Sequence, residues 1–98
     1  MLKQVGVTED GRPVVAGLFR LYETHGLPVS VIFEGVDLNG SVPSWIDFYE
    51  EARQAGIKSS RIISMLQSDI ADVFGGPFRD VVIERLERYI ELTEGGQP

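Results

Sequence analysis

Three consecutive stretches of apolar residues at helical spacing, separated by glycine, restrict most strongly how this chain can fold. Apolar side chains recur every three or four residues in residues 44–55, 59–74 and 77–92, as they do on the buried face of an amphipathic helix. Gly56 follows the first stretch and a glycine pair follows the second, and glycine is the residue that most often ends a helix. The sequence therefore predicts three helices joined by short turns.

The first half of the chain predicts two further helices. Residues 12–25 carry apolar side chains at helical spacing, and residues 28–38 open with a proline, which suits the first turn of a helix. Residues 28–38 also show the alternation of a strand, and a ribbon formed with residues 3–7 is the alternative. We favour the helix, because a lone strand among helices leaves its backbone groups without hydrogen-bond partners.

Together these segments predict an all-α fold, namely a compact bundle of four to five short helices in one domain. A chain of 98 residues with 43% apolar residues matches a single globular domain. We expect an ordered core over about residues 11–92 and tails at both ends, residues 1–10 and 93–98. A domain of this size has little spare stability, so association with a second copy would help it.

Composition excludes several classes of function. The chain has no cysteine, so it can form neither a disulfide nor a thiolate metal site. No signal peptide is evident and the apolar runs are too short to span a bilayer, so we expect a cytoplasmic protein without membrane contact. The net charge of −6 argues against nonspecific coating of DNA, which requires broad neutralisation of phosphates.

Residues 48–67 contain one pattern that bears on function. Ala52, Gly56 and Ile62 stand where a DNA-reading helix-turn-helix has its small residue, its turn glycine and its core β-branched residue. Over these residues the chain resembles that broad class, although Glu51 departs from the pattern, which has an apolar residue there. The resemblance implies that residues 59–74 form the helix that reads the DNA.

The candidate contacts of this segment form a polar strip without acids, and they are Arg53, Lys58, Ser60, Arg61, Ser64 and Gln67. Arg61 has the chemistry to reach a guanine edge and Gln67 an adenine edge, while lysine and arginine hold phosphates. The same pattern also describes an ordinary helical hairpin, and Asp69 and Asp72 further along the helix would repel a DNA backbone. The strip is thus a candidate contact surface for either DNA or a protein.

No arrangement of residues indicates catalysis. His25 is the only histidine, and no metal ligands or catalytic partners stand at a useful spacing from it. Its position at the end of a predicted helix favours contact with the last carbonyl groups. We therefore expect no enzyme activity, no metal, no cofactor and no small-molecule substrate.

Two hypotheses about function remain. The first is a small non-catalytic helical protein-interaction module that docks to a protein partner or associates with itself. Residues 77–92 are apolar over an arc wider than one core stripe, which makes Phe78, Val81, Ile83 and Ile90 candidates for self-association. The alternative is a helix-turn-helix DNA-binding protein that reads DNA with residues 59–74.

Overall fold

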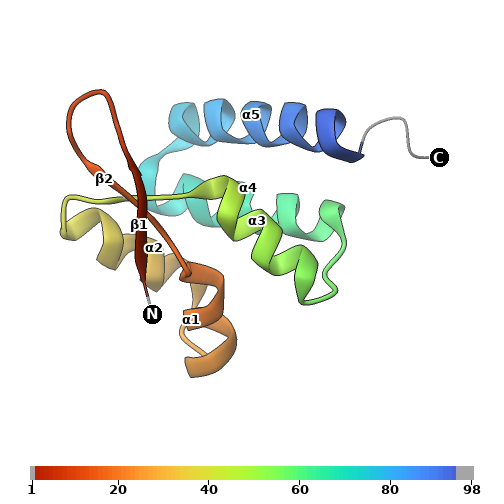
Figure 1. The fold of residues 1–98 in the computed structure, drawn as a ribbon, viewed down its shortest axis with the longest axis horizontal. Coiled ribbons are helices and arrows are strands. Elements are labelled where there is room, and N and C mark those ends of the chain that lie inside the picture. The colour runs from red at the N-terminus through yellow and green to blue at the C-terminus, as the bar shows by residue number, and fades with distance from the viewer. Residues whose placement is uncertain (1, 95–98) are drawn as a thin grey trace.

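The computed structural model describes residues 2–94 and begins with a pair of strands (Figure 1). β1 (Lys3–Val7) and β2 (Pro13–Ala16) run antiparallel, and the short β3 (Val42–Pro43) pairs in parallel with β2. The order in the sheet is β1-β2-β3, which leaves β1 at an outer edge. Over the described residues the fold is therefore α+β, and the prediction of an all-α bundle is wrong.

The helix predicted over residues 12–25 is a strand in its first part. Val14 and Val15 are β-branched residues that favour an extended backbone, and they lie in β2. Gly17 then adopts a φ of 95°, and α1 (Leu18–His25) begins only after it. The helical spacing seen in the sequence thus combines side chains from two different elements.

The predicted N-terminal tail is also wrong for residues 3–10, which form β1 and most of an ordered loop. The Thr8 N–H donates to the Arg12 carbonyl (2.8 Å), and the Arg12 N–H donates to the Thr8 hydroxyl (2.9 Å). Gly11 supplies the positive φ of 87° that this turn requires. At the other end, Glu94 closes α5 (Gly76–Glu94), and the rest of the predicted tail, residues 95–98, lies outside the described residues.

The remaining helices confirm the predicted segments. They are α2 (Val29–Leu38), α3 (Trp45–Gln54) and α4 (Ser59–Phe74), followed by α5. The alternative ribbon between residues 28–38 and residues 3–7 is wrong, because residues 3–7 pair with β2 instead. Across residues 2–94, the helices are too short or too polar to span a membrane.

α4 forms the centre of the core and packs against α2, α3 and α5. Ile62, Leu66 and Ile70 on its inner face are fully buried, as are Phe33 from α2 and Tyr49 from α3. Complete burial of such a side chain is worth about 1.5–3 kcal/mol, so this cluster holds the helices together. α5 runs antiparallel to α4 after the glycine turn, and Figure 1 shows its first turns beside the β1–β2 hairpin.

Candidate functional site

The helical hairpin predicted over residues 48–67 is present as α3, a tight turn and α4. Gly56 adopts a φ of 92° in the turn, and the Ile57 N–H donates to the Ala52 carbonyl (3.1 Å). Ala52 and Ile62 are completely buried, so the small residue does allow the two helices to approach. This geometry is common to DNA-reading hairpins and to ordinary helical hairpins.

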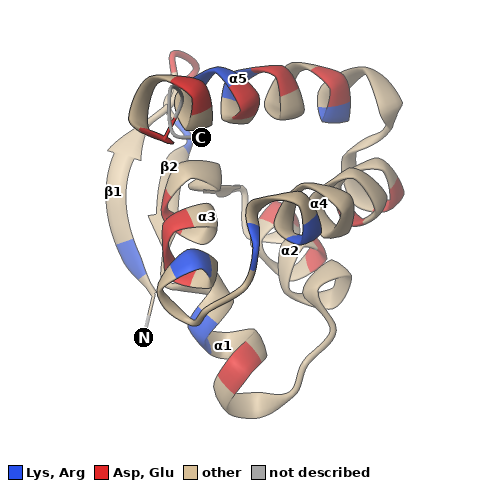
Figure 2. Ribbon diagram, turned by 90° about the vertical axis from the view of Figure 1, so that its right-hand side faces the viewer, with Lys and Arg blue, Asp and Glu red and all other residues tan. Residues whose placement is uncertain are grey.

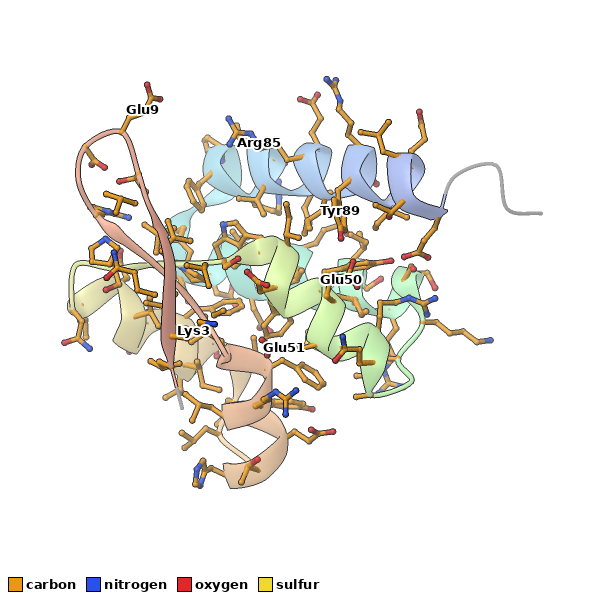
Figure 3. The ribbon with its side chains drawn as sticks, in the orientation of Figure 1. Lys3, Glu9, Glu50, Glu51, Arg85 and Tyr89 are labelled. Atoms are coloured by element: carbon orange, nitrogen blue, oxygen red, sulfur yellow. The ribbon has the colours of Figure 1, made fainter. Side chains whose placement is uncertain are left out.

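Glu51, which breaks the helix-turn-helix pattern, has a structural partner outside the hairpin. Its Oε2 accepts a hydrogen bond from the Gly17 N–H (3.0 Å) at the start of α1 (Figure 3). Carboxylates are favourable at this position, because the first N–H groups of a helix lack partners within the helix. Its Oε1 is buried and has no hydrogen-bond partner among the described residues. Glu51 therefore joins α3 to α1.

The six candidate contacts of the hairpin are all exposed: Arg53, Lys58, Ser60, Arg61, Ser64 and Gln67. Figure 2 shows the basic residues near the α3–α4 connection, whereas acidic residues lie toward the far end of α4. One of the six already has partners within the chain. Arg53 donates to the Ile57 carbonyl (3.2 Å) and forms an ion pair with Glu94 (3.5 Å).

Glu94, at the end of α5, places a negative charge beside the first turn of α4. Its carboxylate accepts hydrogen bonds from the Tyr49 hydroxyl (2.6 Å) and from the Ser59 hydroxyl (3.4 Å). Burial raises the pKa of Tyr49, and the hydrogen bond to Glu94 raises it further. The position where a helix N-terminus would attract a phosphate is thus next to a carboxylate of the same chain.

The structure separates the four residues predicted for self-association. Ile83 is 6% exposed and belongs to the core, while Phe78 and Ile90 are partly buried and pack against the core. Only Val81, at 51% exposed, faces largely toward solvent. The wide apolar arc of α5 is therefore divided between the protein interior and a groove on the surface.

This groove lies between the β1–β2 hairpin and the first half of α5. Its volume is about 590 Å³, and its lining comes from the hairpin and its loop, β3, the start of α3 and α5. Val14, Trp45, Ile46, Phe78 and Val81 supply much of the apolar lining. The volume falls within the range of about 300–1,000 Å³ that is typical of ligand pockets.

Sequence reasoning missed the groove because it missed the hairpin that forms one wall. A signal was present: Asp10-Gly11 separates two valine-containing stretches, and that dipeptide between apolar runs is a strong indication of a hairpin. His25, the only histidine of the sequence, is exposed at the end of α1. Within residues 2–94, no group of three or more His, Cys, Asp or Glu side chains is placed to hold a metal ion.

Three charged residues line the groove, and two of them are arginines. Arg12 comes from the ordered loop and Arg85 from α5 (Figure 3); among the described residues neither forms an ion pair within 4.0 Å. Asp10 is the single acid of the lining. A hydrogen bond from the Thr8 hydroxyl, aided by the nearby Arg12, lowers the pKa of Asp10. The groove thus has a positive balance in a chain whose net charge is −6.

A second, smaller hollow of about 300 Å³ lies between α1 and α3. It is lined by Phe19, Arg20, Glu23, Glu51, Gln54 and Ala55. Its lining is more polar than that of the groove, and Glu51 there already bonds to Gly17. We therefore consider the larger groove the better candidate for binding.

Comparisons of the chain with protein-family models, with curated proteins and with solved structures found no match.

Proposed function

We propose that this protein is a non-catalytic protein-interaction module. Its groove between the β1–β2 hairpin and α5 binds a partner segment that presents an apolar side chain flanked by carboxylates. The observation that carries the proposal is the groove itself, which combines an apolar lining with two arginines that lack an acidic partner among the described residues.

The apolar lining suits the side chain of a partner. Ile46 and Val81 are large side chains that remain substantially exposed, and both line the same groove. Isolated apolar residues on a surface are normal, but several that converge in a concave site favour binding. An aliphatic or aromatic side chain from a partner would remove these groups from water, as anchor residues do at protein interfaces.

The charges of the groove favour an acidic partner. Arg12 and Arg85 each present a guanidinium group suited to bidentate contact with a carboxylate. In the whole chain acidic residues outnumber basic ones (Figure 2), which disfavours contact of such a partner with the rest of the molecule. Complementary charge of this kind mainly raises the association rate and fixes orientation, so binding should weaken as salt increases.

Selection from a library of phage-displayed random peptides tests the proposal directly. The selected peptides should combine apolar residues with Asp or Glu. Their affinity for Val81→Glu, measured by fluorescence anisotropy, should fall at least about tenfold, which corresponds to about 1.4 kcal/mol. Arg85→Glu should weaken the same peptides. Leu38→Glu, at an exposed site on α2 that does not line the groove, serves as the matched control.

Circular dichroism first establishes that each variant is folded. An absence of enriched peptides, or peptides that bind Val81→Glu as tightly as the wild type, would contradict the proposal. Enrichment of basic peptides would contradict the part of it that concerns the arginines.

A second candidate function is DNA reading through α4. It is favoured by the exposure of Lys58, Ser60, Arg61, Ser64 and Gln67 along the helix that follows the Gly56 turn. The ion pair of Arg53 with Glu94 weighs against it. Selection from random DNA duplexes at low salt, followed by gel shift, decides between the two. If neither the wild type nor Arg61→Ala enriches any sequence, DNA reading is rejected.

A further inference from the structure

β1 is an edge strand of the sheet, and four of its five residues are exposed. β3, at the other edge of the sheet, is buried, whereas β1 packs mainly against β2 and lies on the outside of the molecule in both ribbon views (Figures 1 and 2). An open edge presents backbone N–H and C=O groups that can pair with another strand.

The pairing with β2 indicates which groups face that open edge. The Thr8 N–H donates to the Arg12 carbonyl (2.8 Å), and the next pair along the strands is Val7 with Pro13. Hydrogen-bonded and non-hydrogen-bonded pairs alternate in an antiparallel ladder, and proline has no N–H to donate. The N–H and C=O of Val7 therefore point away from β2, toward the open edge.

Apolar side chains accompany this edge. Leu2 is 43% exposed, Val5 46% and Val7 60%. Natural proteins usually protect edge strands with charges, proline or covering elements, and here three apolar residues of one short segment remain in water. A bulge lies between Gln4 and Gly6, in the middle of this edge, and the outward-facing groups of Val7 lie just beyond it.

We propose that β1 pairs antiparallel with β1 of a second copy, related by a two-fold axis, so that one sheet continues through both molecules. The charges near the two ends of β1 favour a second copy of the chain as the partner, and they favour antiparallel pairing. Lys3 and Glu9 lie at opposite ends of the strand and its loop (Figure 3). Two-fold antiparallel pairing sets the Lys3 end of each copy beside the Glu9 end of the other, twice per dimer, whereas parallel pairing would bring like charges together.

This surface differs from the α5 residues that the sequence suggested for self-association. Neither Lys3 nor Glu9 lines the groove, but Glu9 stands between Thr8 and Asp10, which do. Lys3→Glu therefore tests self-association away from the proposed peptide site, and loss of the dimer in this variant with peptide binding retained separates the two proposals.

Sedimentation equilibrium of the wild type and four variants tests the proposal. Protein concentrations from about 1 to 500 µM cover the dissociation constants expected of a weak dimer. The wild type should form a dimer. Lys3→Glu and Glu9→Lys should each raise the dissociation constant about tenfold, since each replaces two attractive contacts of the dimer with two repulsive ones. The double variant should recover the wild-type dissociation constant. Glu34→Lys, an exposed site on α2, controls for the change in net charge that Glu9→Lys makes.

Hydrogen exchange of the Val7 amide locates the contact. Its protection should rise with protein concentration in the wild type and not in Lys3→Glu. Four outcomes overturn the proposal: a monomer throughout the range, a dimer that both single substitutions leave unchanged, a double variant that stays dissociated, or a dimer whose Val7 amide gains no protection.

Discussion

Truncation of two residues on α5, only two positions apart from each other, should have very different effects on stability. Ile83 is 6% exposed within the core, and removal of buried atoms from isoleucine to alanine costs about 2–5 kcal/mol. Alanine returns about 0.5 kcal/mol of helix propensity, so Ile83→Ala should lose about 3 kcal/mol. Val81 is 51% exposed. Its truncation to alanine therefore loses only about half of the roughly 1.5 kcal/mol that a fully buried valine contributes. Val81→Ala gains similarly in helix propensity, which leaves almost no net change.

Urea denaturation followed by far-ultraviolet circular dichroism measures both variants. Ile83→Ala should shift the midpoint while leaving the slope unchanged, and its melting temperature should fall by about 12–24 °C in a domain of this size. Val81→Ala should stay within about 0.5 kcal/mol of the wild type.

A small loss for Ile83→Ala, below about 1 kcal/mol, would refute the reasoning. So would an equal loss for both variants. Either result would mean that α5 is rotated relative to the structure and that Ile83 belongs to an exposed face, as the sequence pattern suggested. Measurement at several protein concentrations separates this effect from any change in self-association.

Three further predictions concern single contacts and backbone positions. A hydrogen bond to Glu50 raises the pKa of Tyr89 to about 12. Unfolded tyrosine titrates near 10, so this stabilisation is complete below about pH 10 and disappears toward pH 12. Because the contact is partly exposed, urea titrations should show a loss of about 1 kcal/mol that Tyr89→Phe does not show. Gly35→Ala should stabilise by about 0.5–1 kcal/mol at an open, exposed helix site, whereas Gly56→Ala should destabilise by about 1 kcal/mol because φ is 92° there; thermal melts of both check this contrast. Glu94→Gln should speed hydrogen exchange of the last turn of α5 and cost at most about 1 kcal/mol, since its ion pair is partly exposed.

α4 shows what the sequence was able to predict. Its apolar residues keep one helical period over four turns. Gly56 precedes the helix and Gly75 follows it, so its limits are marked in the sequence. Local signals of this kind depend only on neighbouring residues, so the predicted range 59–74 agrees with the structure. The turn at Gly56 and the burial of Ile62 follow from the same local pattern.

The sheet could not be predicted in the same way, because its pairing is not local. Val14 and Val15 continue the spacing of α1 and so appear helical when the sequence is considered alone. Their extended form is stabilised by β1 on one side and by Val42 and Pro43 on the other, and these partners are visible only once the chain is folded. Strand preference is set largely by such neighbours.

The candidate contact residues of the α3–α4 hairpin also divide into features that follow from local sequence and features that depend on tertiary packing. The exposure of Ser60, Arg61 and Ser64 follows from the helical period, because residues opposite the buried stripe must face solvent. The partner of Arg53 does not follow, since Glu94 is distant in sequence and reaches it only through the packing of α5 on α3 and α4. The charge of the α4 surface therefore had to be read from the structure.

The two candidate binding surfaces lie at opposite ends of the α4–α5 pair. The groove uses the first half of α5, including Val81, whereas Glu94 at the end of α5 contacts Ser59 at the start of α4. Glu94 lies thirteen positions after Val81 in α5, which corresponds to about 20 Å along the helix. An extended peptide needs about six residues to span that distance, so a shorter one seated in the groove does not reach the far end of α5. Val81→Glu should therefore weaken peptide binding at least about tenfold and leave any DNA binding intact, whereas Arg61→Ala should weaken DNA binding and leave peptide binding intact. Loss of one activity in both variants would require a single partner extended across the whole helical pair.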